Sequence, residues 1–230
     1  MTAQHRKGER GMTLFAVLAL MAISCVFLLT VASTVQIDIQ REKEQEAIYR
    51  GEEVAEAIRQ YVEFYRGAKL PNSMDDLLKG LPQGTKDRAI LRLSASIDPM
   101  SEDGKWRLIQ ADPMKLQGFA RKVQGYNGGM MPTNPSPTFD RYTAALNSSV
   151  IVNIDGTTTD QDSLDDDMDF DTITDNVPFI GVASQSRAHS VLTYYGLDTE
   201  SKWIFTPLFR GTQSRIVPIR PGTLPVRPTR

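Results

Sequence analysis

The sequence has one cysteine and two histidines in 230 residues. One cysteine cannot close an internal disulfide, and zinc sites built from cysteine pairs or Cys/His clusters are excluded. The chain also lacks a GxGxxG loop, a P-loop and a GxSxG elbow, so nucleotide binding and α/β-hydrolase chemistry have no support. His189 lies between Ser186 and Ser190 without an identifiable carboxylate partner. We therefore predict that this histidine is structural and that the chain is not an enzyme.

Charge is balanced in sum but unevenly distributed along the chain. There are 26 Lys and Arg against 28 Asp and Glu, which gives a net charge of −2. Residues 155–176 hold nine Asp and no Lys or Arg, so the rest of the chain is net basic. Basic residues are not interleaved with aromatic residues in any one patch, and we predict no nucleic-acid binding.

Residues 12–37 contain no charged side chain, and residues 14–32 are almost wholly apolar. About 20 such residues in a helix span the roughly 30 Å hydrocarbon core of a membrane. Arg6, Lys7 and Arg10 precede the run with only Glu9 opposing them. Since cationic flanks stay in the cytoplasm, the pattern predicts a membrane helix with its N-terminus inside and residues after about 38 outside. Cys25 should be a small buried apolar residue in this helix.

A cleaved secretory signal begins in the same way, but its apolar core is usually only about 7–15 residues long. Here residues 38–66 continue without proline and are rich in strong helix formers. Apolar residues recur on one predicted helical face, at Ile48, Ala55, Ile58, Val62 and Tyr65. The sequence therefore predicts one continuous helix from the membrane segment onward, with Gly51 as its weak point, at a cost of roughly 1 kcal/mol relative to Ala.

The junction at Arg10, Gly11, Met12, Thr13 and Leu14, followed by the apolar run, resembles the class III leader of type IV pilins and type II secretion pseudopilins. The resemblance implies cleavage by a prepilin peptidase between Gly11 and Met12, N-methylation of Met12, and Thr13-Leu14 as the usual pair after it. Glycine suits the junction because a protease needs an extended backbone there.

One residue departs from the family pattern. The family usually carries Glu at mature position five, where it is thought to meet a neighbour's N-terminal amine, and Ala16 stands there instead. A buried carboxylate in lipid is costly unless paired, so its absence eases membrane residence but removes that assembly contact. Because the tip subunit of pseudopili also lacks this Glu, the resemblance favours a minor, tip-located or initiating subunit.

The part after the helix reads as a small α+β domain, residues 67–213. Ser73 and Asp76 form a variant capping box and Gly80 a stop, which predicts a short helix between them. Residues 97–109 read as a turn followed by a strand, residues 150–152 as a possible edge strand, and residues 179–206 as two or three antiparallel strands. The predicted short helix, the turn and strand of residues 97–109 and the strands of residues 179–206 are similar in order and spacing to blocks of pseudopilin-like proteins. The Gly/Pro/Asn-rich run 125–137 should not hold regular structure for long.

Two charged segments leave alternatives open. The Asp-rich loop 155–176 is either a solvated surface insertion or a calcium site, with candidate ligands Asp160, Asp162, Asp165 and Asp167. It lacks the DxDxDG pattern with a twelfth-position Glu, which favours the plain loop, and we predict no other cofactor. The tail 214–230 has four Pro and four Arg and no acid, which is typical of a disordered end or of a docking strand for an acidic partner.

These observations predict an α+β, pilin-like fold in which the second half of a long N-terminal helix packs on a C-terminal antiparallel sheet. The chain divides into five parts: leader 1–11, membrane and filament helix 12–37, amphipathic continuation 38–66, periplasmic domain 67–213 and tail 214–230. The function that the resemblance implies is a structural subunit of a type II secretion pseudopilus or a pilus-like filament, stored in the inner membrane. Its partners would be other pilin subunits, the prepilin peptidase, the inner-membrane assembly platform and the membrane itself. The alternative is a membrane-anchored periplasmic scaffold or binding protein that never polymerises.

Overall fold

The computed structural model describes residues 9–130, 132, 136–144 and 173–209, without the side chains of residues 9–11 and 28–35. Its architecture is α+β, as predicted, with one long helix and three small antiparallel sheets among the described residues. In chain order the elements are α1 (Glu9–Phe64), α2 (Met74–Lys79), β1 (Leu81–Gln83), β2 (Lys86–Arg88), β3 (Arg107–Gln110), α3 (Pro113–Tyr126), η1 (Pro137–Phe139), β4 (Phe179–Ala183), β5 (His189–Tyr194), β6 (Leu197–Thr199), η2 (Glu200–Lys202), β7 (Ile204–Phe205) and η3 (Pro207–Phe209).

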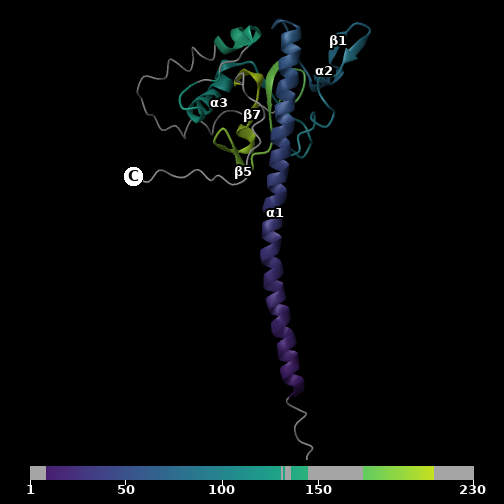
Figure 1. The fold of residues 1–230 in the computed structure, drawn as a ribbon, viewed down its shortest axis with the longest axis vertical. Helices are drawn as coiled ribbons and strands as arrows, with labels where there is room; N and C mark the ends of the chain where they lie inside the picture. The colour runs from purple at the N-terminus through teal and green to yellow at the C-terminus, as the bar shows by residue number, and fades with distance from the viewer. Residues whose placement is uncertain (1–8, 131, 133–135, 145–172, 210–230) are drawn as a thin grey trace, which may run out of the picture.

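Helix α1 runs through 56 residues without a break, so it is about 84 Å long at 1.5 Å per residue. All other elements gather around its C-terminal half, and the N-terminal half stands clear of them (Figure 1). We call the C-terminal half of α1, together with these other elements, the head. The predicted continuity of the two helical segments is confirmed. Ala55, Ile58 and Val62 are fully buried, and Ile48 and Tyr65 are partly buried against the core, so the predicted face is confirmed too.

The end of α1 is a Schellman-type cap. The Gly67 amide donates to the carbonyl of Val62 at 2.9 Å, and the Arg66 amide donates to the carbonyl of Glu63 at 3.0 Å. Arg66 takes the left-handed position, with a φ of 52°, which glycine usually fills at helix ends. The polypeptide therefore turns sharply here and leaves the helix axis.

The central sheet has the strand order β3-β4-β7 and is antiparallel throughout. All five residues of β4 are buried, which fits a strand covered on both faces. Helix α1 packs along β4, β5 and β7, as the predicted contact between helix and sheet requires. The largest buried side chains of the core are Trp106, Trp203, Phe139, Phe179 and Phe205.

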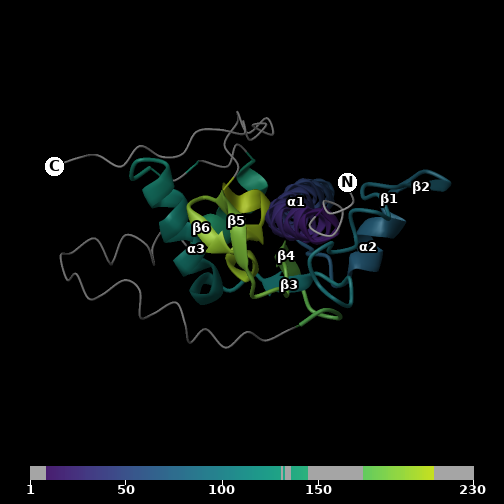
Figure 2. The ribbon, with the colours of Figure 1, turned by 90° about the horizontal axis from the view of Figure 1, so that it is seen from below.

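The remaining elements lie on two sides of α1. Viewed along the helix, α2 and the β1–β2 hairpin lie on one side, and α3 and the β5–β6 hairpin on the other (Figure 2). The four strands found in residues 179–205 confirm the expected antiparallel strands there, although β4 pairs with β3 and β7 and only β5 and β6 form a hairpin. Strand β3 also follows the turn that the sequence predicted in residues 97–109.

Helix α2 begins after Ser73 and ends at Gly80, as predicted. The predicted capping box is not formed as such, because the Ser73 side chain makes no capping hydrogen bond. Instead the Asp76 carboxylate accepts from the Asn72 amide at 3.0 Å. Gly80 has a φ of 83°, and a Cβ there would lie 2.0 Å from the carbonyl oxygen of Arg88. Glycine is therefore needed where α2 passes into the hairpin.

Helix α3 was not predicted from the sequence, and neither were strands β1 and β2. The signals for this helix are local and ordinary: Asp112 caps the helix by accepting from the Met114 amide at 2.9 Å, and Pro113 fills the first turn. Its buried residues recur at helical spacing, at Leu116, Phe119, Ala120 and Val123. The helix extends through Tyr126, so the first two residues of the Gly/Pro/Asn-rich run are helical.

Candidate functional site: the exposed apolar rod

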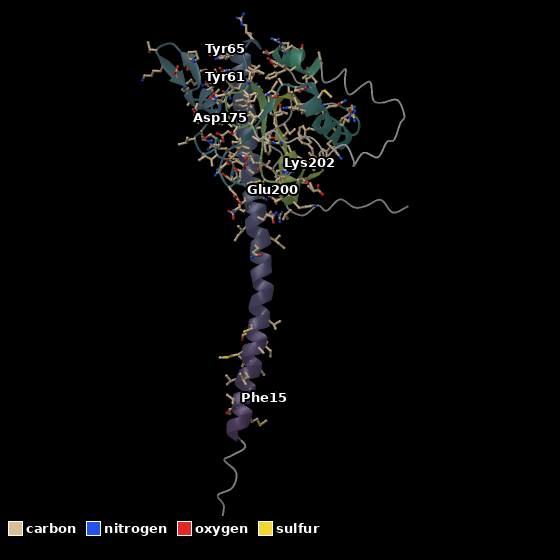
Figure 3. The ribbon with its side chains drawn as sticks, turned by 180° about the vertical axis from the view of Figure 1, so that it is seen from behind. Phe15, Tyr61, Tyr65, Asp175, Glu200 and Lys202 are labelled. Atoms are coloured by element: carbon tan, nitrogen blue, oxygen red, sulfur yellow. The ribbon has the colours of Figure 1, made fainter. Side chains whose placement is uncertain are left out.

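The N-terminal half of α1 exposes a continuous apolar surface. We call residues 12–27 the apolar rod, and all of them are exposed in the structure. Its large apolar side chains are between 53% and 79% exposed, namely Met12, Leu14, Phe15, Val17, Leu18, Leu20, Met21, Ile23, Val26 and Phe27. Phe15 lies on this part of the helix, far from Tyr61 and Tyr65 in the head (Figure 3). A contiguous apolar surface of this kind marks a site of interaction with protein or lipid.

The rod is apolar on every side, whereas the part of α1 inside the head has one buried face and one exposed, polar face. Polar and charged residues follow from Asp38, and the first fully buried side chain of the head-side half is Glu44. A helix that is apolar all round needs an apolar environment over its whole circumference, unlike an amphipathic helix, which needs it on one face. The two halves of α1 therefore have different surroundings to satisfy.

Among the residues whose side chains the structure describes, which leave out residues 28–35, no helix is both long and apolar enough to cross a membrane.

The residues of the predicted processing junction lie in the first turns of α1. The helix already begins at Glu9, so the backbone at Gly11 is helical in the structure. The first turn of a helix has amides without intrahelical partners and opens at small cost, so a protease could still unwind it. Thr13, Leu14 and Ala16 follow on the exposed rod, and the single Cys25 is exposed there as well.

The rod joins the head at one turn of α1 that binds strand β5. Gln40 donates through Nε2 to the carbonyl of His189 at 3.0 Å and to Glu44 Oε1 at 2.9 Å. Glu44 accepts from the amides of Val191 and Leu192 at 2.8 and 2.6 Å. Its side chain is 0% exposed, so a carboxylate and two backbone amides meet away from water. The sequence analysis missed this residue, although Glu44 lies four residues before Ile48 on the predicted buried face.

Two more carboxyl groups are buried near this junction. Asp98 is 1% exposed and accepts from Ser184 Oγ at 2.8 Å and from the Met100 amide at 3.0 Å. Burial raises the pKa of the Asp98 carboxyl above its ordinary value. Burial likewise raises the pKa of Glu200, and the negative charges of Glu44 and Asp98 add to the effect while a hydrogen bond from Ser186 opposes it.

A buried arginine accompanies these acids. Arg107 donates through Nη2 to the carbonyl of Ser201 at 2.6 Å, and its side chain is largely enclosed. Burial, together with the positive charge of Arg187, lowers the pKa of Arg107 to about 10. The junction between helix and head thus carries several ionisable groups out of contact with water.

The calcium candidates Asp160, Asp162, Asp165 and Asp167 lie outside the described residues, as do the predicted edge strand 150–152 and the tail 214–230. In the ranges that the structure does describe, no group of three or more His, Cys, Asp or Glu side chains is placed to hold a metal ion. The end of the Asp-rich run is described, and Asp175 lies 3.7 Å from Lys105 Nζ in an exposed ion pair.

His189 is placed at the surface of β5. Its Nε2 lies 3.3 Å from Asp198 Oδ2, and both side chains are mostly exposed. The Ser190 hydroxyl donates to the carbonyl of Leu192 at 2.7 Å and not to the imidazole. These two residues therefore do not have the geometry of a nucleophile and its base.

No protein-family model, curated protein or solved structure matches the chain. Support for a function therefore comes from the geometry of α1 and from its attachment to the head.

Proposed function

We propose that the chain is a minor structural subunit of a type II secretion pseudopilus or a related pilus-like filament. Residues 12–37 hold it in the inner membrane, with the N-terminus in the cytoplasm and the head in the periplasm. The prepilin peptidase removes residues 1–11, and the inner-membrane platform and other subunits then take up the rod in assembly.

The observation that carries the proposal is the division of one unbroken helix into two environments. Residues 12–27 are exposed and apolar, whereas from Glu44 onward one face of the same helix is buried by the head. A rod of this kind fits a lipid bilayer and fits a bundle of identical rods equally well. Moving it from lipid to bundle exchanges one set of apolar contacts for another, at modest net cost.

The sequence around residue 11 supports both an orientation in the membrane and a cleavage point. Basic residues before the rod favour a cytoplasmic N-terminus, and Gly11 followed by Met12, Thr13 and Leu14 supports cleavage at this point. Ala16 supports a position in the filament that does not require the usual carboxylate. A charge at that exposed helix position would have to find a partner inside an apolar bundle.

The N-terminus of the mature protein tests the proposal. The full chain is expressed with and without a prepilin peptidase, and its N-terminus is read by mass spectrometry. The expected result is N-methyl-Met12 only when the peptidase is present. An intact Met1 would instead support a plain membrane anchor, and a start near Ser33 or Thr34 would mean a cleaved secretory signal.

Two glycines of the leader provide a matched pair of variants. Gly11→Leu should abolish the cleavage, because the side chain hinders the extended backbone at the scissile bond. Gly8→Leu makes the same change three residues away and should leave processing intact. Equal processing of both variants would show that Gly11 does not define the junction.

The position of the subunit in the filament is tested at Ala16. If the missing carboxylate restricts the subunit to the tip, Ala16→Glu should appear along the shaft when labelled subunits are imaged. Ala16→Gln is the uncharged control of similar size. An unchanged tip-only distribution of the Glu variant would show that this residue does not decide placement.

A further inference from the structure

A single carboxylate of α1, that of Glu44, binds two neighbouring backbone amides of β5. Glu44 Oε1 accepts from the Val191 amide and Oε2 from the Leu192 amide. In a regular strand, consecutive amides point to opposite edges, so one group cannot bind both. Here the β5–β6 register shifts between His189 and Tyr194, which allows two neighbouring amides to reach the same side chain.

Only a charged carboxylate satisfies this arrangement fully. An ionised Glu accepts with both oxygens, whereas a protonated Glu or a Gln carries hydrogens on one of the two positions. Either change would turn a donor toward one of the two amides and leave it without an acceptor. Because Glu44 is 0% exposed, water does not replace the lost acceptor without a local opening.

Other contacts between α1 and the end of β5 lie further along the helix. The Tyr194 hydroxyl donates to Glu52, two turns after Glu44. At the rod side of Glu44, the described contact of α1 with β5 is the bond from Gln40 to the His189 carbonyl. Release of Glu44 would therefore detach the middle of β5 from α1, while Gln40 still binds the beginning of the strand and Glu52 its end.

We propose that Glu44 is an acid-sensitive latch that fastens the head to α1 at strand β5 and releases that strand when its carboxylate takes up a proton.

Charged groups of several described elements surround the latch. Glu200 of η2 lies close enough to Glu44 and to Asp98, in the loop before β3, for the negative charges of both to raise its pKa. Arg107 of β3 is buried as well, and the positive charge of Arg187 lies close enough to lower its pKa. On β5 itself, His189 is paired with Asp198. Acidification adds protons to this set of carboxyl groups and so removes the negative charge that the latch requires.

Hydrogen exchange of the backbone amides tests the proposal. The full chain in detergent micelles is measured at neutral and acidic pH by mass spectrometry, with rates corrected for intrinsic exchange. In the wild type, peptides that cover Val191 and Leu192 should be protected at neutral pH and should lose protection on acidification. Peptides from β3 and β4 should stay protected at the same pH.

Glu44→Gln should show the open state already at neutral pH, with roughly ten- to hundredfold faster exchange in β5, the effect of leaving a buried amide without its acceptor. Glu46→Gln is the matched control, because Glu46 is two residues away, is exposed and pairs with Arg50 at 2.8 Å. It should behave as the wild type. Unchanged protection of β5 in Glu44→Gln would overturn the proposal.

Two further outcomes would also overturn it. If acid exposes β3, β4 and β5 together, the transition is global unfolding and not the opening of a latch. If His189→Gln abolishes the response to acid, the histidine and not the carboxylate is the sensor. Should Glu44→Gln fail to fold, the wild-type comparison of β5 with β4 and the His189→Gln variant still decide the question.

Discussion

The ring of Phe205 occupies the space in which a side chain at Gly51 would begin. A Cβ added to Gly51 would lie 2.3 Å from Cδ2 of Phe205 and 2.4 Å from its Cγ. The same ring contacts Trp106 edge-on, with the centroids 5.8 Å apart. Helix and sheet thus approach each other closely at a residue without a side chain.

Gly51→Ala should therefore destabilise the protein, although alanine is the better helix former. Helix propensity favours the variant by roughly 1 kcal/mol, but the ring would have to leave a close-packed site. Forced overpacking of a core costs typically about 1–3 kcal/mol, so we expect a net loss. Urea unfolding of the full chain in detergent, followed by the fluorescence of the buried tryptophans, measures it.

Gly125→Ala is the matched control for this prediction. Gly125 lies in α3 at an exposed position, and a Cβ there would meet nothing within 4 Å. The same substitution should stabilise the protein by up to about 1 kcal/mol, because only the conformational freedom of glycine is removed. If both variants shifted the midpoint in the same direction, packing against Phe205 would not be the reason for Gly51.

The Gly51 contact also marks the limit of prediction from sequence. Periodicity was sufficient to predict the continuous helix and its buried face at Ile58 and Val62, because these features are local. Gly51 looked like a weak point because its partner Phe205 is remote in sequence. The role of Glu44 is hidden for the same reason, since its amide partners follow 147 and 148 residues later. A glutamate among charged neighbours has no local sign of burial.

Helix α3 was missed for a different reason. Its cap, its proline and the spacing of Leu116, Phe119 and Val123 were all present in the sequence. No prediction was made for residues 110–124, and only the Gly/Pro/Asn-rich run that begins at Gly125 was interpreted. The signals for a helix lie before that run, and glycine near a helix end is common.

The cap of α3 gives the second prediction. Asp112→Ala removes the side-chain oxygen that accepts from the Met114 amide at 2.9 Å. Loss of such a cap costs typically about 1 kcal/mol, and we expect the unfolding midpoint to fall accordingly. Asp112→Asn retains an acceptor oxygen and should lie close to the wild type. An equal loss in both variants would show that charge, and not the cap, is what Asp112 contributes.

The third prediction concerns the pH dependence of stability at Glu200. Its pKa in the folded protein lies above the ordinary value of 4.5, chiefly because it is buried. The folded state therefore binds a proton more tightly than the unfolded state. The stabilisation that this proton provides is present at low pH and is lost as the pH rises from the unfolded pKa through the folded one.

Glu200→Gln removes this dependence. The stability of the variant relative to the wild type should increase as the pH is raised from 4 to 7, whatever the offset at the lowest pH. Urea unfolding at several pH values in this interval measures the difference, and Glu102→Gln at an exposed position controls for the loss of one charge. If the difference in stability between Glu200→Gln and the wild type stayed constant with pH, burial would not be raising the pKa of the Glu200 carboxyl.

The fourth prediction concerns the apolar rod. Leu20 and Ile23 are 68% and 71% exposed and belong to the apolar rod, which stands clear of the head (Figure 1). Near the centre of a membrane helix, each lysine costs about 2.5–3.5 kcal/mol. The double variant Leu20→Lys with Ile23→Lys should therefore lose most of its association with phospholipid vesicles in a flotation assay. The near-ultraviolet circular dichroism of Trp106 and Trp203 should remain, because the head is untouched.

The double variant Leu20→Ala with Ile23→Ala separates charge from lost side-chain volume and should still float with the vesicles. The double variant Glu42→Gln with Glu46→Gln makes the same change in net charge on the polar part of α1, where it should have little effect on flotation. If the rod lysines left flotation unchanged while the pair at Glu42 and Glu46 abolished it, the head-side half of the helix would be the part that holds the protein to lipid. The apolar character of residues 12–27 would then have to be satisfied by protein alone, in the bundle of a filament.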